Sequence, residues 1–265
     1  TDITLAIPSV GATENAILAA CGAEGTSVIY NAAREPEIVD LQALLRSMGA
    51  RVNGAGGSII TVEGGAALHG CTHRVIGDRI VCATYLCAAA AAGGEVRLTG
   101  VDYRAVSTVA LSLAESGCEV RSEADAVSLR STGALRSVRP VRTAPYPGFP
   151  TDAQPVLMAA LLRSEGCTVF VENIFENRYR HVDELSRMGA EIRVAGRVAV
   201  VNGVRTLHGA AVKCTDLRGG AALGIAGLSA EGTTRVTELT HIDRGYDAIE
   251  RDLAALGAQI RRETT

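Results

Sequence analysis

The sequence predicts an α/β protein built from four copies of one supersecondary unit, on three observations. Each copy closes on a glycine followed by Ala or Cys, and these glycines stand 68, 72 and 68 residues apart: Gly49, Gly117, Gly189 and Gly257. Each copy opens on a Glu-Gly or Gly-Gly step, at residues 24–25, 93–94, 165–166 and 231–232. Between these marks, a strand-like run, a loop with an arginine and a helical run recur in order. A fixed period with a shared internal pattern indicates repeated structural units.

Two runs of each unit predict helices. The first run is rich in small residues, which is typical of helices that are buried on several sides: Thr13–Ala23, Arg79–Ala92, Ala153–Ser164 and Leu217–Ala230. The second run has apolar residues at helical spacing in three of the copies, beginning near Ile38, Val182 and Ile249.

Short strands complete the unit. A strand follows the opening step, as in residues 27–30 and 168–171, and residues 51–52 and 59–62 predict a hairpin around a glycine-rich turn. The closing glycines stand where a helix C-cap glycine belongs. Each unit therefore reads as strand, helix, strand, helix and two further strands. The best candidate boundaries lie near residues 70–76 and 145–155.

Composition excludes several classes of protein. Of the 265 residues, 47% are hydrophobic but only 3% are aromatic, and Trp is absent, so we expect an aliphatic core. The net charge of −3 does not indicate a nucleic-acid partner. No apolar run approaches the roughly 20 residues that span a bilayer, and no signal segment opens the chain. We therefore expect a cytoplasmic protein without a membrane partner.

Seven cysteines show neither CxxC pairing nor a histidine at zinc spacing, so we expect buried, reduced thiols and no metal site.

Aspartates precede three of the small-residue helices: Asp78, Asp152 and Asp216. One interpretation is simple N-capping, for which Thr151 and Gln154 also fit a capping box. The other is an anion site, because helix N-termini present unpaired N–H groups and partial positive charge. The spacing leaves both open.

An arginine occupies the loop between strand and second helix in every unit: Arg34, Arg104, Arg178 and Arg244. Arg218 is a fifth candidate at the start of the last small-residue helix. Guanidinium groups suit bidentate capture of phosphate or carboxylate. Helix N-termini and arginines together predict a polyanionic ligand, which physical chemistry alone does not name.

Six motifs occur in an order typical of one family. They are PSVGATEN (residues 8–15), NAAREPEIVD (31–40), PYPGFPTD (145–152), FENR (175–178), TDLR (215–218) and HIDRGY (241–246). Together they resemble the UDP-N-acetylglucosamine enolpyruvyltransferases (MurA type) over essentially the whole chain.

The resemblance implies an inside-out α/β barrel of six βαβαββ repeats in two globules, as in EPSP synthase. Residues 1–76 resemble the last repeat of the first globule, and residues 77–265 the three repeats of the second. Four of six repeats are then present, and roughly the amino-terminal third is missing. The family's Lys-Asn pair and its loop with a proton-donating cysteine fall in that part, so we expect this chain to be incomplete for catalysis.

The implied reaction moves the enolpyruvyl group of phosphoenolpyruvate to the 3-hydroxyl of UDP-N-acetylglucosamine and releases phosphate, without a cofactor. In the family this step opens peptidoglycan synthesis, on which cell shape and division depend. Asp152 matches the expected general base. Arg178, Arg218 and Arg244 match arginines that bind phosphoenolpyruvate. The remaining implied substrate contacts are Ser9, Val10 and Gly11 at the uridine diphosphate, and Ile174 against the nucleotide-sugar.

Other readings stay open. The related enzyme that acts on shikimate 3-phosphate shares the fold and chemistry. A non-catalytic remnant would bind nucleotide-sugar, or pair with a separate amino-terminal chain, without turnover. Apolar surface left uncovered by absent repeats would also promote self-association. A purely structural repeat protein gives no reason to retain Asp152 with three arginines.

Overall fold

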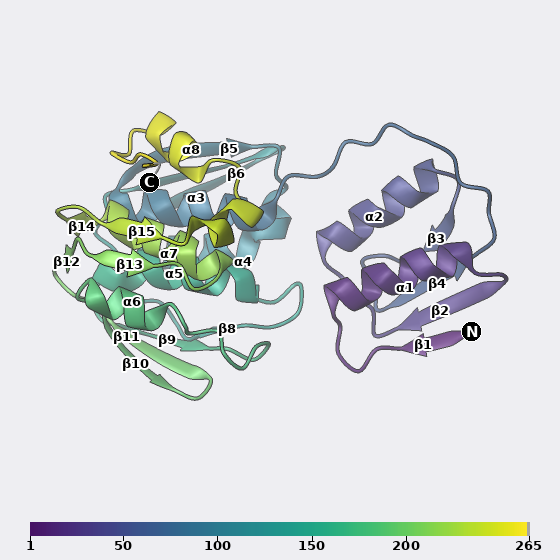
Figure 1. Cartoon of the computed structure of the whole chain (residues 1–265), viewed down its shortest axis with the longest axis horizontal. Coiled ribbons are helices and arrows are strands. Elements are labelled where there is room, and N and C mark those ends of the chain that lie inside the picture. Colours follow the sequence, from purple (N-terminus) through teal and green to yellow (C-terminus); the bar gives the residue numbers. More distant parts are fainter. Residues whose placement is uncertain (264–265) are drawn as a thin grey trace. The chain divides into compact units, whose positions relative to one another are not determined.

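The computed structural model describes residues 1–263, which form an α/β structure in two compact units. Unit 1 comprises Thr1–Gly77 together with Pro145–Gly148. Unit 2 comprises Asp78–Ala144 and the described residues from Phe149 onward. Figure 1 labels most of the helices and strands of both units. That these units represent parts of two globules of a six-repeat protein stays a prediction.

Unit 1 is one complete βαβαββ repeat. Its elements are β1 (Asp2–Thr4), α1 (Val10–Gly22), β2 (Thr26–Tyr30), α2 (Pro36–Ser47), β3 (Arg51–Asn53) and β4 (Ile59–Glu63). The strands form one sheet in the order β1-β2-β4-β3, parallel between β1 and β2 and antiparallel elsewhere. Both helices pack on one face of this sheet, over a core that includes Ile17, Ile29 and Ile60 (Figure 1).

Unit 2 contains the remaining elements. Its helices are α3 (Arg79–Ala92), α4 (Tyr103–Glu115), α5 (Gln154–Ala160), α6 (Val182–Arg187), α7 (Leu217–Leu228) and α8 (Ile249–Ala255), with 3-10 turns η1 (Thr151–Ala153), η2 (Leu161–Arg163) and η3 (Leu239–Arg244). Its strands are β5 (Gly94–Thr99), β6 (Glu119–Glu123), β7 (Ala126–Ser131), β8 (Val141–Arg142), β9 (Cys167–Val171), β10 (Glu191–Ala195), β11 (Val198–Asn202), β12 (Leu207–His208), β13 (Ala211–Lys213), β14 (Ala230–Glu231) and β15 (Arg235–Thr237).

The predicted repeat is confirmed by the sheet topology. The sheet β8-β9-β11-β10 has the strand order and directions of β1-β2-β4-β3, and β5-β7-β6 lacks only the first strand. In the last copy, β13 pairs parallel to β15 as β1 does to β2, and β12 pairs parallel to β14. The described residues after α8 add no strand.

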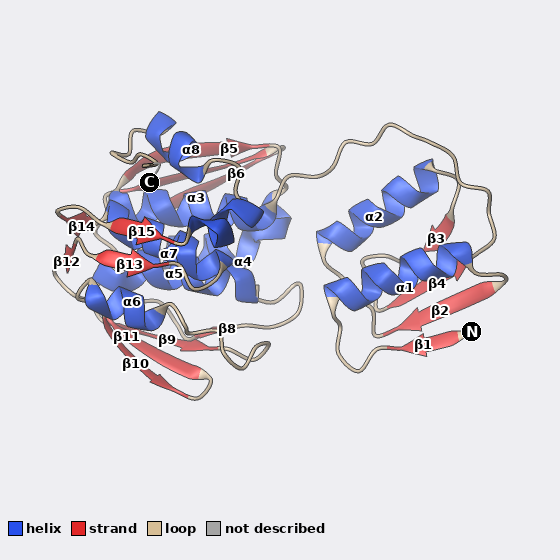
Figure 2. Ribbon diagram, viewed as in Figure 1, coloured by secondary structure: helices blue, strands red, loops and turns tan. Residues whose placement is uncertain are grey.

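The small-residue helices of unit 2 form its interior. Helices α3, α5 and α7 pack against one another, with the sheets around them (Figure 2). Every residue of α5 is buried, as is most of α3. Helices inside and sheets outside are the predicted inside-out arrangement. Helix α1 differs, since it buries only one face and leaves Leu18 51% exposed. Unit 1 has a single sheet, which can cover only one face of its helices.

The predicted helix over residues 153–164 is wrong in detail, because the segment divides into η1, α5 and η2. Pro155 lies at the start of α5, where its missing N–H is tolerated and its ring fits. The helix over Arg79–Ala92 has the predicted bounds.

All seven cysteines are free, and the prediction that they are buried holds for five of them. Cys71 and Cys167 are exposed, because they lie in an irregular segment and at the first position of β9. Burial raises the pKa of the Cys82 thiol to about 12, which makes this thiol a poor nucleophile. Within residues 1–263, no helix combines the length and apolar character that crossing a bilayer requires.

The closing glycines confirm the predicted helix ends. All four have left-handed backbone angles, with φ of +97°, +111°, +92° and +102° at Gly49, Gly117, Gly189 and Gly257. A side chain is strained in this conformation, so glycine is required where the helix ends and the chain reverses.

Gly117→Ala should therefore lower the free energy of unfolding by about 1 kcal/mol, because alanine resists φ of +111° although space exists for its Cβ. Gly224→Ala in the interior of α7 is the matched control, since nothing lies within 4 Å of the added Cβ and alanine favours a helix. Urea unfolding of both variants tests this. Equal stability of the two variants would contradict a conformational role for Gly117.

Candidate active site

The three aspartates at equivalent positions behave differently. Asp78 caps α3 by accepting from the N–H groups of Ile80 and Val81, at 2.7 and 3.0 Å. Asp216 caps α7 in the same way, by accepting from the N–H groups of Arg218 and Gly219, at 3.1 and 2.8 Å. Asp152 lies within η1 and caps nothing. N-capping is therefore right for two of the aspartates, and the third is available for chemistry.

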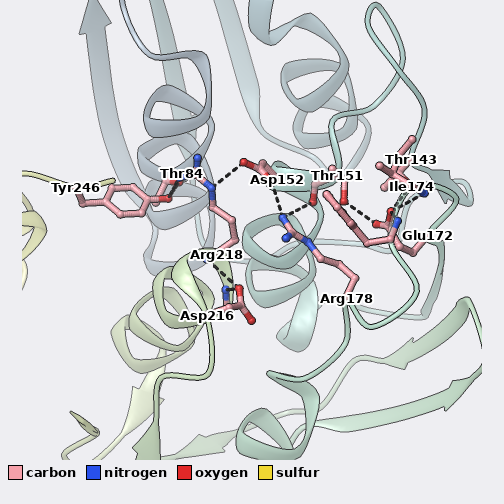
Figure 3. Close-up of polar contacts among 12 residues, drawn as sticks. Thr84, Thr143, Thr151, Asp152, Glu172, Ile174, Arg178, Asp216, Arg218 and Tyr246 are labelled. Carbon is pink, nitrogen blue, oxygen red and sulfur yellow. Dashed lines mark hydrogen bonds and ion pairs between the residues drawn. The ribbon is translucent and has the colours of Figure 1, made fainter. Parts of the chain in front are cut away.

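Two arginines hold Asp152. Its Oδ1 accepts from Arg178 Nη2 at 2.6 Å and its Oδ2 from Arg218 Nε at 3.1 Å (Figure 3). Both guanidinium side chains are largely buried, at 15% and 11% exposed, whereas the aspartate is 38% exposed. The three residues come from η1, from the loop after β9 and from the first turn of α7. The fold thus presents one accessible carboxylate oriented by two buried cations.

The predicted capping box at Thr151 and Gln154 is wrong. Thr151 Oγ1 donates instead to Glu172 Oε2 at 3.0 Å, and Gln154 is fully buried. Glu172 is a buried carboxylate directly after β9 that the sequence analysis missed. Its position directly after a buried strand and just before the FENR motif could have identified Glu172 as a candidate site residue.

Tyr246 contacts the Arg218 guanidinium through both its hydroxyl and its ring. Arg218 Nη1 donates to the tyrosine hydroxyl at 3.2 Å, and its guanidinium lies 5.5 Å from the ring centroid. The same hydroxyl lies 2.8 Å from Thr84 Oγ1 on α3 (Figure 3). Burial raises the pKa of Tyr246, which keeps it a neutral phenol. Helix α3 and the residues after η3 therefore fix the arginine that reaches Asp152.

A cavity of about 530 Å³ lies beside this cluster. It is lined by Ile174, Phe175, Glu176, Asn177, Arg178, Arg180, Arg197 and Asp216. The apolar side chains of Ile174 and Phe175 are 36% and 50% exposed there, and the Arg178 guanidinium lies 5.5 Å from the Phe175 ring. Apolar surface next to several arginines suits a ligand that has both a ring and negative charge.

The predicted arginines do not all meet. Arg178 and Arg218 share Asp152, whereas Arg104 pairs with Asp102 at the start of α4, at 2.6 Å. Arg244 ends η3, is exposed, and makes no contact with Asp152 among the described residues. Its proposed role stays a prediction.

In unit 1, the start of α1 contacts the loop that carries Arg34. Ser9 caps α1 through the Ala12 N–H at 3.4 Å, so Val10 and Gly11 form the first turn of α1. The Thr13 hydroxyl accepts from the Ala33 N–H at 2.9 Å, beside Arg34. Gly11 is exposed, and nothing lies within 4 Å of a Cβ placed on it.

His181 is buried next to the Asp152 cluster. Both of its ring nitrogens are buried and lack a hydrogen-bond partner among the described residues. Burial lowers its pKa to about 4, with Asp216 opposing and Arg178 adding to this shift. The histidine is therefore neutral at pH 7 and adds no charge to the site. No cluster of three or more His, Cys, Asp or Glu within residues 1–263 could hold a metal ion.

Comparison with known families identifies the fold. The family model of EPSP synthase (3-phosphoshikimate 1-carboxyvinyltransferase) matches residues 1–253. The chain belongs to the EPSP synthase family.

Two similar curated proteins are named UDP-N-acetylglucosamine 1-carboxyvinyltransferases. That of Gluconacetobacter diazotrophicus is 53% identical over 260 residues, which cover 98% of this chain and 62% of the relative. Enzyme 1 of Symbiobacterium thermophilum is 52% identical over 262 residues, which cover 99% of this chain and 59% of that relative. The resemblance inferred from the six motifs is confirmed. The chain spans about 60% of the length of the curated relatives that it matches.

Two solved structures have the same fold as this chain. The enolpyruvyl transferase NikO from Streptomyces tendae matches with a TM-score of 0.86 at 28% identity, covering 98% of this chain and 65% of NikO. EPSP synthase from Acinetobacter baumannii matches with a TM-score of 0.77 at 20% identity, covering 100% of this chain and 64% of that synthase. At this identity the match shows only that the two proteins share a fold.

Acid should destabilise this chain through His181. The pKa of His181 is about 4 in the folded chain and 6.5 in the unfolded chain. Between pH 4 and pH 6.5 the unfolded chain therefore binds more protons than the folded chain does. The contribution of His181 to stability is complete above pH 6.5 and falls by about 3 kcal/mol as the pH drops to 4. Urea unfolding across pH 4–8 should show a flatter profile for His181→Phe. His208→Phe, at an exposed histidine, is the control and should keep the wild-type slope. An unchanged slope in His181→Phe would contradict this.

Proposed function

We propose that this chain forms part of an enolpyruvyltransferase that moves the enolpyruvyl group of phosphoenolpyruvate to the 3-hydroxyl of UDP-N-acetylglucosamine and releases phosphate. One observation carries the proposal. A carboxylate held by two buried arginines, at 2.6 and 3.1 Å, occurs in a chain that is about half identical to UDP-N-acetylglucosamine 1-carboxyvinyltransferases along nearly its whole length.

Asp152 is the proton acceptor in this proposal. In the addition step, the sugar 3-hydroxyl oxygen bonds to C2 of phosphoenolpyruvate while its proton passes to the carboxylate, and C3 receives a proton from a separate acid. In the elimination step, the bond from C2 to the phosphate oxygen breaks and C3 loses a proton, which restores the double bond. The 38% exposure of Asp152 lets a hydroxyl approach, and the two arginines orient its oxygens.

Arg178 and Arg218 bind the anionic co-substrate. Phosphoenolpyruvate carries a carboxylate and a phosphate, and guanidinium groups bind both in a planar, bidentate manner. Largely buried cations stabilise developing negative charge better than hydrated ones do. We assign Arg244 to the same task from its motif alone.

We assign one region of each unit, taken separately, to the nucleotide-sugar from its motif. The apolar side chain of Ile174 lines the cavity beside Asp152 and suits the sugar. Ser9, Val10 and Gly11 form the start of α1, where free N–H groups favour a diphosphate. We also propose that the protein acts in the cytoplasm, in peptidoglycan synthesis, and hence in cell shape and division. A polypeptide that supplies the rest of the relatives' length, or a second copy of this chain, is the partner that we propose.

Transfer to shikimate 3-phosphate is the second candidate, and the description of the matching family model favours it. The 52–53% identity to UDP-N-acetylglucosamine enzymes favours the first. The two acceptors differ in chemistry, because only one carries a nucleotide.

Calorimetric titration with each acceptor tests the choice. UDP-N-acetylglucosamine should bind saturably, and Asp152→Asn should weaken it about tenfold or more, because an ionised partner of the sugar hydroxyl is lost. Asp125→Asn in the exposed turn between β6 and β7 is the matched control and should bind as wild type. Saturable binding of shikimate 3-phosphate alone would support the second candidate. Absence of binding for both would refute an acceptor site in this chain.

A further inference from the structure

Glu172 is a fully buried carboxylate that the proposed reaction does not use. It follows the last residue of β9 and stands three residues before the FENR motif. Burying an ionised carboxylate is very unfavourable unless hydrogen bonds replace its hydration. The contacts of Glu172 are therefore informative about what the residue is for.

Four donors satisfy this carboxylate. Oε1 accepts from Thr143 Oγ1 at 2.9 Å and from the N–H groups of Ile174 and Phe175, at 2.8 and 3.0 Å. Oε2 accepts from Thr151 Oγ1 at 3.0 Å (Figure 3). Hydrogen bonds to an ionised acceptor are short and strong, so a complete set of this kind holds its donors firmly.

The donors come from three segments that build the candidate active site. Thr143 follows β8, Thr151 directly precedes Asp152, and Ile174 and Phe175 line the cavity. Arg178 Nη2 also donates to the Thr151 carbonyl at 3.1 Å, in addition to its bond with Asp152. Thr151 is thus fixed by Glu172 on one side and by Arg178 on the other.

Asp152 needs such support because its own helix start does not fix it. Asp78 and Asp216 are held by N–H groups of the helices that they cap, whereas Asp152 caps nothing. Its position depends on the adjacent Thr151 and on the two arginines.

We propose that Glu172 is a positioning residue for the active site. Its carboxylate holds Thr151 so that Asp152 meets Arg178 and Arg218, and it holds the Ile174–Phe175 backbone that lines the cavity. The ligand-binding part of this inference rests on the proposed function, and the geometric part does not.

Thr151→Val tests the link with the smallest change, since it removes one hydroxyl and keeps the side-chain volume. Thr168→Val is the matched control. Thr168 is buried on β9, and its hydroxyl accepts from the Val138 N–H at 3.2 Å, so this variant also removes a hydrogen-bonded hydroxyl, but one that does not contact Glu172. Thr151→Ser restores a hydroxyl and should rescue the first variant. Glu172→Gln removes the charge and is the strongest variant.

Two measurements distinguish a role of Glu172 in positioning the site from a general contribution to the stability of the fold. Side-chain ¹⁵N spectra of Arg178 and Arg218 report their ion pairs with Asp152 without any ligand, and calorimetry reports the affinity for UDP-N-acetylglucosamine. Thr151→Val should shift the Arg178 signals and lower the affinity about tenfold, with recovery in Thr151→Ser. Thr168→Val should leave the Arg178 signals unchanged and keep the affinity within about twofold, because its hydroxyl does not contact Glu172.

Wild-type arginine signals in Thr151→Val, or equal changes in Thr151→Val and Thr168→Val, would overturn the inference. If the wild-type chain fails to bind the nucleotide-sugar, the proposed function fails, and the arginine spectra still decide the role of Glu172. If Glu172→Gln does not fold, the threonine variants carry the test.

Discussion

Close packing at the start of α7 is the constraint on which the candidate active site depends. A Cβ on Gly220 would lie 2.2 Å from Cys214 Sγ and 2.6 Å from Ile242 Cγ1, and one on Gly219 would lie 2.9 Å from the His181 Cβ. Only glycine permits this approach of α7 to its neighbours. Arg218 directly precedes these glycines, so the same packing places its guanidinium beside Asp152. The small-residue composition of the interior helices thus has a functional consequence as well as a structural one.

The site is a balance of charges in a largely buried setting. Two buried guanidinium groups meet one accessible carboxylate, while Asp216 remains engaged at the start of α7 and His181 stays neutral. An anionic co-substrate with two charged groups would complete this balance, because the arginines present more positive charge than Asp152 offsets. Tyr246 holds Arg218 and Glu172 holds Thr151 by hydrogen bonds, and among the described residues neither of them forms an ion pair with Asp152 or its two arginines.

Much of the fold could be predicted from local pattern. The glycine period located all four helix ends, because a left-handed residue at a helix end leaves few alternatives to glycine. The predicted Arg79–Ala92 helix was right because a long alanine-rich run has one strong preference. The division of residues 151–163 into a short α-helix between two 3-10 turns was missed, since Pro155 and the hydrogen bond from Thr151 to Glu172 override helix propensity there. The exposed face of α1 was also missed, because its sequence resembles that of the buried helices.

By itself, the sequence determined the repeat, the aliphatic interior and the family, since these follow from spacing and from motifs that are local in the chain. It also named Asp152, Arg178 and Arg218 as candidates. Only the tertiary structure decided which aspartate is free of capping, which arginines reach it, and that Glu172, His181 and Tyr246 surround the cluster. Arg178 and Arg218 stand 26 and 66 positions after Asp152 in the sequence. Their hydrogen bonds to Asp152 depend on how the elements within unit 2 pack, which no local pattern encodes.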